Sequence, residues 1–144
     1  MTKDLFVYVR RVAFCDTDAM GVVHHSHYLR YFEEARVAWL REKGLMMAHY
    51  PYSSLCFAVL ESQCRHERAP RFDDELQIAV VVRREGLKIR FRYAIYSMDG
   101  LKRMASGETL LVPVNEKLKP VRLNKEITAR MENELWIEIW PLNL

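Results

Sequence analysis

The chain has 144 residues, of which 50% are hydrophobic and 28% charged, a composition typical of one soluble globular domain. A formal net charge of +3 without a polybasic run argues against a nucleic-acid partner and is compatible with a small anionic ligand. No run of about 18 apolar residues occurs, so no transmembrane segment is expected. The scattered Cys15, Cys56 and Cys64 indicate reduced thiols in a cytoplasmic protein, not a disulfide framework.

The chain begins with a predicted strand over residues 5–14, which are rich in Phe, Val and Tyr. The strand runs into a loop that holds Asp16, Asp18 and Gly21. Aspartates often close loops by accepting hydrogen bonds from nearby backbone N–H groups. A carboxylate beside a helix start can instead attack a bound carbonyl or activate a water molecule. Spacing alone leaves both interpretations open.

A long amphipathic helix is predicted over residues 26–44. Its apolar residues recur at the spacing of one buried helix face: Tyr28, Tyr31, Phe32, Ala35 and Trp39. Ser26 is a suitable N-cap, and Gly44 is suited to end the helix. The opposite face carries Arg30, Glu34 and Arg41, which we expect in solvent.

The remainder of the chain is predicted to be mostly β-structure. Four extended stretches are bounded by turn residues: 55–67, 76–84, 87–95 and 102–113. The third stretch alternates apolar with mostly basic residues, which predicts a strand with one apolar and one basic face. Asp99 and Gly100 form a strong hairpin signal. The short turns suggest that these strands follow one another as antiparallel hairpins.

A single domain is predicted over residues 1–134, ending in a short helix at residues 125–133. Residues 135–144 form a tail that adds one strand or packs as an arm. One long helix against an antiparallel sheet of about five strands is a two-layer α+β fold. Because the helix covers only one face of the sheet, we expect a second subunit to bury the remaining edges or faces.

Three histidines, His24, His25 and His27, stand at the predicted helix start. Histidines at this spacing can ligate zinc, but no downstream cluster completes such a site, so we expect no metal. His25 is the histidine best placed to touch a substrate. Glu33 and Arg36, one helical turn apart, suit a surface ion pair, although Glu33 could also border a ligand pocket.

Basic residues cluster around one predicted hairpin. They suit either a solvated sheet face or a clamp for the phosphates of a nucleotide-bearing ligand: Arg83, Arg84, Lys88, Arg90 and Arg92. No glycine-rich phosphate-binding loop is present in the sequence.

One long motif gives the sequence a family resemblance. It reads D-T-D-A-M-G-V-V-H-H-S-H-Y-L-R-Y-F-E-E-A-R, at residues 16–36. It resembles the signature of hotdog-fold acyl-CoA thioesterases of the 4-hydroxybenzoyl-CoA thioesterase family, and most of all the branch encoded with the Tol-Pal system. The stretch A-P-R-F-D-D-E-L at residues 69–76 and the strand order are also similar, over about residues 5–132.

The resemblance implies a hotdog fold, in which an antiparallel sheet wraps a long central helix. It implies a homo-oligomer, dimer or tetramer, with active sites at the dimer interface. Asp18 matches the family's catalytic carboxylate, and His25 matches the helix-start residue whose backbone N–H polarises the substrate carbonyl. Two positions depart from the pattern: His24 stands where Tyr is frequent, and Lys88 where Ser is frequent.

We therefore predict an acyl-CoA thioesterase that releases a free acid and coenzyme A and needs no cofactor beyond the coenzyme A of its substrate. Asp18 and His25 are the predicted catalytic residues. The substrate-binding candidates are Gly21, Val22, His24, Glu33, Arg83, Arg84 and Lys88. The thioester carrier is coenzyme A or, alternatively, an acyl carrier protein. A hotdog acyl-thioester hydratase or dehydratase, a non-catalytic binding module for the same ligands and a metal hydrolase stay open as alternatives.

Overall fold

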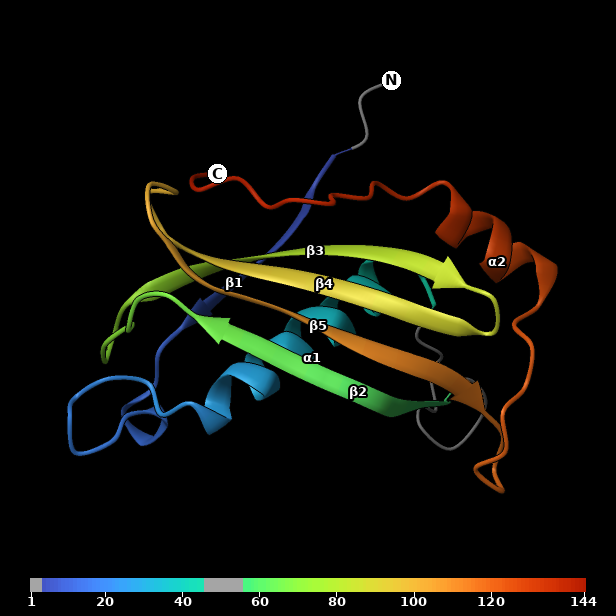
Figure 1. Ribbon diagram of the computed structural model, residues 1–144, viewed down its shortest axis with the longest axis horizontal. Helices are drawn as coiled ribbons and strands as arrows, with labels where there is room; N and C mark the ends of the chain where they lie inside the picture. The colour runs from blue at the N-terminus through green and yellow to red at the C-terminus, as the bar shows by residue number, and fades with distance from the viewer. Residues whose placement is uncertain (1–3, 46–55) are drawn as a thin grey trace.

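The computed structural model describes residues 4–45 and 56–144. Its elements follow in the order β1 (Phe6–Arg11), η1 (Phe14–Asp16, a 3-10 turn), α1 (Ser26–Glu42), β2 (Cys56–His66), β3 (Glu75–Glu85), β4 (Lys88–Ser97), β5 (Arg103–Val114) and α2 (Lys125–Glu132). The strands form one antiparallel sheet in the order β1-β3-β4-β5-β2. Helix α1 lies along one face of this sheet (Figure 1), which confirms the predicted α+β hotdog arrangement. None of the described helices is long and apolar enough to cross a membrane.

Helix α1 is held by its predicted apolar stripe, which faces the sheet. Tyr31, Phe32 and Ala35 are fully buried, and the Phe32 ring stacks on Tyr93 of β4 with centroids 4.5 Å apart. Gly44 follows the last helical turn at a φ of +67°, and its N–H donates to the Arg41 carbonyl at 3.1 Å. This left-handed backbone is one that glycine adopts readily, so Gly44 ends the helix as predicted.

Gly107 of β5 allows α1 to approach the sheet closely. A Cβ atom there would lie 2.4 Å from the Gln63 carbonyl oxygen and 2.5 Å from a ring carbon of Phe32. We expect Gly107→Ala to lower the free energy of unfolding by about 1–3 kcal/mol, because neither a paired strand nor a packed ring can move aside freely. Urea unfolding measures this loss. The neighbouring Ser106→Ala is the matched control, and equal stability of the two variants would contradict the packing argument.

The strand order differs from the predicted succession of hairpins. β3, β4 and β5 follow one another as hairpins, but β2 pairs with β5 at one edge of the sheet. β1 takes the place beside β3, where Phe6 pairs with Val80 and Arg11 with Glu75. Turn residues signal that the chain reverses, but they do not decide which strand becomes the neighbour. Leu55, the predicted start of the second strand, lies outside the described residues.

Residues 135–144 form an arm with no strand. It returns from α2 toward the other end of the sheet (Figure 1). Trp140 is only 5% exposed and belongs to a second apolar cluster, which is separate from the cluster beneath α1. The other buried members of this second cluster are Ala79, Val81, Ala94 and Tyr96.

Side chains of the sheet hold the backbone of this arm. Arg92 donates to the Ile137 carbonyl at 2.7 Å, and Arg103 donates to the Trp140 carbonyl at 2.8 Å. These two carbonyls are thus satisfied by guanidinium groups and not by a neighbouring strand. The chain's own arm thus covers apolar residues on this face of the sheet, and burial of the remaining edges or faces by a second subunit stays a prediction.

Candidate active site

Asp18 sits in a tight loop between η1 and α1. Its backbone N–H donates to the Val22 carbonyl at 3.0 Å, and its own carbonyl accepts the Gly21 N–H at 2.9 Å. Gly21 adopts a φ of +77°, the left-handed backbone that this turn requires. Asp18 Oδ1 accepts the Met20 N–H at 2.8 Å, whereas Oδ2 accepts no hydrogen bond from any described residue. The half-buried carboxylate therefore keeps one oxygen available for chemistry.

Two backbone contacts join this loop to the connection between β2 and β3. Val22 forms an isolated bridge with Arg71, and the Val23 N–H donates to the Pro70 carbonyl at 2.9 Å. The fold thereby brings together the two segments that carry the family resemblance. Gly21 and Val22, both predicted to bind substrate, lie in this loop with Asp18.

The start of α1 follows directly. His25, and not Ser26 as predicted, occupies the N-cap position, and no side chain of the N-cap residue caps the helix. His24 supplies the missing acceptor: its Nδ1 lies 2.8 Å from Ser26 Oγ and accepts the Ser26 N–H at 3.3 Å. The His25 N–H donates to no acceptor within the described residues. One backbone donor is therefore free at the positive end of α1.

The three histidines are close together without forming a metal site. The His24 ring lies 4.2 Å from the His25 ring and 6.3 Å from the His27 ring, centroid to centroid. Within residues 4–45 and 56–144, no group of three His, Cys, Asp or Glu side chains is arranged to hold a metal ion.

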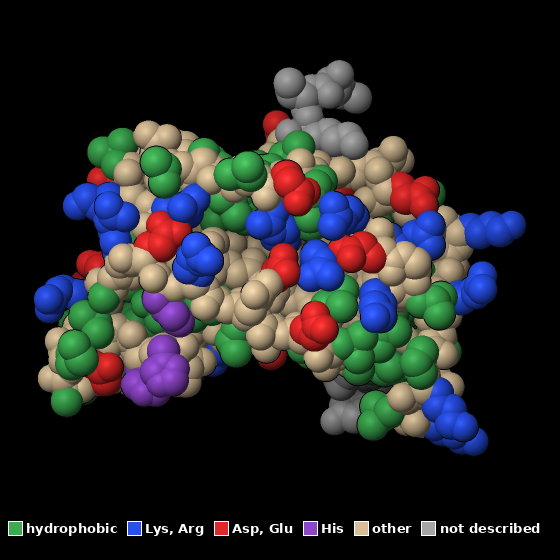
Figure 2. Space-filling model, in the orientation of Figure 1, with side chains coloured by type: hydrophobic (Ala, Val, Ile, Leu, Met, Phe, Trp, Pro, Cys, Tyr) green, Lys and Arg blue, Asp and Glu red, His purple; other side chains and the backbone are tan. Residues whose placement is uncertain are grey.

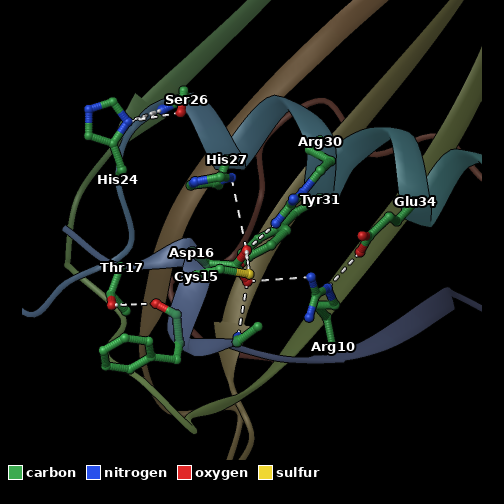
Figure 3. A network of polar contacts seen from close by, with 12 residues as sticks. Arg10, Cys15, Asp16, Thr17, His24, Ser26, His27, Arg30, Tyr31 and Glu34 are labelled. Carbon is green, nitrogen blue, oxygen red and sulfur yellow. Dashed lines mark hydrogen bonds and ion pairs between the residues drawn. The ribbon is translucent and has the colours of Figure 1, made fainter.

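Asp16 has a different environment from Asp18. It is fully buried, and its Oδ2 accepts the Tyr31 hydroxyl at 2.7 Å and the Ala13 N–H at 3.0 Å (Figure 3). Its Oδ1 accepts a hydrogen bond from the Arg30 guanidinium. Burial raises the pKa of Asp16, but the hydrogen bonds from Tyr31, Ala13 and Arg30 outweigh burial and lower the net pKa below its ordinary value. Asp16 anchors the loop, which leaves Asp18 as the free carboxylate.

This anchor explains why β1 is shorter than predicted. The strand ends at Arg11, because Phe14–Asp16 turns into η1 to deliver the Asp16 carboxylate beneath α1. Arg10, which precedes the last residue of β1, donates to the Glu34 carboxylate at 2.7 Å, and its guanidinium lies 3.4 Å from the Asp16 carboxylate.

Sequence reasoning missed the partners of Asp16. It placed Arg30 and Glu34 in solvent; Arg30 is indeed exposed but also binds Asp16, and the half-buried Glu34 binds Arg10 (Figure 3). Their spacing of four residues shows that they share one helix face, but nothing in the pattern identifies a buried carboxylate as the target. Tyr31 was assigned to the apolar stripe, but its hydroxyl also donates a hydrogen bond to Asp16.

Arg36 forms the predicted ion pair with Glu33, but it is buried and not on the surface as predicted. It is 8% exposed, and one guanidinium nitrogen donates to the Tyr93 hydroxyl at 3.2 Å and to Thr109 Oγ1 at 3.4 Å. The Glu33 side chain is 67% exposed and lies 3.9 Å from the guanidinium. Arg36 stands one turn from Phe32 and from Trp39, and this position on the apolar stripe was the available signal. The role of Glu33 at a pocket stays a prediction.

Arg83, Arg84 and Lys88 lie at the hairpin between β3 and β4, at the other end of the sheet from the Asp18 loop (Figure 1). Within one chain, the structure therefore does not bring them to Asp18. Arg83 donates to Glu85 at 3.2 Å, and Arg84 donates to Glu132 at 2.8 Å. Figure 2 shows basic and acidic side chains interspersed on the visible face. The role of Arg83, Arg84 and Lys88 as a phosphate clamp stays a prediction.

Known proteins match this chain in sequence and in fold. Residues 12–131 match the family model described as the thioesterase-like superfamily. The chain is 30% identical over 134 residues to the acyl-CoA thioester hydrolase YbgC of Escherichia coli O157:H7. This match covers 92% of this chain and 99% of that protein. A hypothetical protein of Aquifex aeolicus has a similar structure, with a TM-score of 0.79, 32% identity and coverage of 88% and 98% of the two chains. The 1,4-dihydroxy-2-naphthoyl-CoA thioesterase of Synechocystis shares the fold, with a TM-score of 0.80, 19% identity and coverage of 90% and 97%.

Proposed function

The chain belongs to the thioesterase-like superfamily and is an acyl-CoA thioesterase, and we propose that Asp18 and the first turn of α1 carry out its hydrolysis. The products are a free acid and coenzyme A. The observation that carries the proposal is the unengaged His25 N–H at the start of α1, next to a loop in which Asp18 keeps a free carboxylate oxygen.

The helix start supplies the electrostatic part of the reaction. The thioester carbonyl oxygen accepts the His25 N–H, and negative charge that develops on this oxygen is stabilised by the positive end of α1. One donor of this kind is typically worth about 3 kcal/mol of transition-state stabilisation.

Asp18 supplies the chemical part. Its free oxygen attacks the carbonyl carbon to give a mixed anhydride that water then opens, or it removes a proton from the water that attacks. In both routes the carbon–sulfur bond breaks, the sulfur leaves as coenzyme A thiol, and water provides the oxygen and protons of the products. No step requires a metal or a redox cofactor.

We infer that the active unit is a homo-oligomer, either a dimer or a tetramer. β2 is an edge strand, and on its outer side it has no strand partner among the described residues. Val59 and Leu60 on this strand are 49% and 48% exposed. Edges of this kind pair readily with another chain. In such an assembly the partner subunit's Arg83, Arg84 and Lys88 are available to bind the coenzyme A phosphates beside Asp18.

Three finer assignments are part of the same proposal. We place the chain in the branch resembling the thioesterases encoded with the Tol-Pal system, on the strength of the motif at residues 16–36. We place the protein in the cytoplasm, where its three scattered cysteines would stay reduced. The thioester carrier is coenzyme A, with an acyl carrier protein as the alternative.

Release of free thiol from a panel of acyl-CoA and acyl-carrier-protein thioesters tests the proposed reaction. We expect thiol release that is unchanged by a metal chelator. A hydratase or dehydratase would change the acyl group and leave the thioester intact, and a binding module would bind the thioester without any turnover. Either of these results, or loss of activity with chelator, would contradict the proposal.

A further inference from the structure

The side chain of His24 caps the first turn of α1. Its Nδ1 accepts the Ser26 N–H at 3.3 Å, one of the backbone donors at a helix start that no helical carbonyl can satisfy. The same nitrogen lies 2.8 Å from Ser26 Oγ. A backbone N–H only donates, so Nδ1 must present a lone pair. The geometry therefore requires a neutral imidazole with its proton on Nε2.

His24 also links the helix to the Asp16 anchor through its backbone. Its N–H donates to the Asp16 carbonyl at 2.9 Å, and its carbonyl accepts the His27 N–H at 3.0 Å. His25 lies between these contacts along the chain, so they fix the direction of its free N–H. The His24 side chain is the one contact in this set that depends on a proton.

We propose that His24 is a positioning residue whose neutral ring holds the start of α1 so that the His25 N–H faces the thioester, and whose protonation releases that hold. The inference rests on the proposed function, because the thioester is the group that His25 is assigned to polarise. It makes hydrolysis sensitive to acid at a residue that does not itself touch the reacting atoms.

Protonation of His24 removes a hydrogen-bond acceptor and adds a charge at the helix start. Protonated Nδ1 can no longer accept the Ser26 N–H, and the new charge stands at the positive end of the helix. The Asp16 carboxylate of η1 is already held by Arg30. The titratable and charged groups of the elements packed around this segment include Arg10 of β1, Asp16 of η1, Asp18 of the loop, His25, His27 and Arg30 of α1, His66 of β2, and Arg71, Asp73 and Asp74 of the β2–β3 connection.

The pH dependence of kcat/KM separates this role from a purely structural one. Glutamine at position 24 offers an amide oxygen that accepts a hydrogen bond at every pH. We expect the wild type at about pH 5 to retain about one-tenth of its own value at about pH 8, because a protonated Nδ1 cannot accept the Ser26 N–H. His24→Gln should retain at least about half of its own value over the same range. The matched control is His27→Gln, which removes another ring of the same cluster, one that caps no backbone group. Its kcat/KM should fall between about pH 8 and about pH 5 as much as that of the wild type.

Nitrogen NMR of the His24 ring gives a second readout that needs no turnover. We expect the Nε2–H tautomer at about pH 8, with the Ser26 amide signal shifting as the ring gains a proton. An Nδ1–H tautomer at that pH would overturn the inference. So would a His24→Gln variant whose kcat/KM decreases in acid as much as that of the wild type. Absence of thiol release from the wild type at every pH would instead overturn the proposed function, and the two failures are thus distinguishable.

Discussion

The Asp18→Asn variant is expected to have a kcat/KM for acyl-CoA hydrolysis at least about 100-fold below that of the wild type. Asparagine keeps the size of the side chain, and its amide oxygen can still accept the Met20 N–H, so the loop should keep its shape. The amide is neither a nucleophile nor a base, so both proposed routes are lost. Thiol release monitored with a thiol-reactive dye measures the loss, with circular dichroism and light scattering to confirm the fold and the oligomer size.

Asp73→Asn is the matched control for this substitution. Asp73 is exposed and has a φ of +70°, a backbone that asparagine also tolerates. It lies on the β2–β3 connection, where it pairs with Arg11 at 3.3 Å. This variant should stay within about twofold of the wild type, as surface substitutions usually do. Equal rates for Asp18→Asn and Asp73→Asn would remove Asp18 from the chemistry.

Replacing Asp16 with alanine is expected to lower the free energy of unfolding by about 3 kcal/mol. The change leaves the Tyr31 hydroxyl and the Ala13 N–H without their buried acceptor, and it leaves Arg30 without its carboxylate. Urea unfolding monitored by intrinsic fluorescence measures the loss. Asp16→Asn keeps the volume and one acceptor oxygen and should lose less. If alanine and asparagine were both neutral, Asp16 would not be the anchor of the loop.

The Asp16 network also predicts how stability depends on pH. The pKa of Asp16 in the folded protein lies below the ordinary value of 3.8, because the hydrogen bonds of its ionised form outweigh burial. Its stabilising contribution is therefore fully present above that ordinary value and is lost as the pH falls through the lower folded pKa. The stability difference between wild type and Asp16→Ala should shrink over that acidic range. A difference that grows as the pH falls would contradict the sign of the shift.

Residues with a strong periodic environment were predictable from the sequence. The stripe of α1 and the alternation in the first half of β4 follow from one-sided burial, and Gly44 ends the helix through its backbone preference. The place of β2 at the far edge was not predictable, because pairing depends on contacts between segments distant in sequence. The tail carried an alternating pattern, but it forms an arm in which guanidinium groups bind the Ile137 and Trp140 carbonyls in place of a neighbouring strand.

The candidate site was predicted in part. Asp18 and His25 were singled out by the motif, and the structure places them in one loop and helix start. Loop closure was one of two interpretations left open for Asp16, but its side-chain partners and the contact between His24 and Ser26 were not predicted, since both depend on which polar atom lies within hydrogen-bonding distance in three dimensions. Asp16 and Asp18 look equivalent in the sequence, and only burial and partners distinguish the anchor from the free carboxylate.

The central claim is that Asp18 drives cleavage of an acyl-CoA thioester, and a rapid-quench experiment with enzyme in excess over acyl-CoA tests it most directly. Coenzyme A and free acid are quantified by mass spectrometry for the wild type and for Asp18→Asn. We predict equal amounts of the two products from the wild type, and a variant that still binds the thioester but leaves it intact. Cleavage by Asp18→Asn at the wild-type rate would contradict the account.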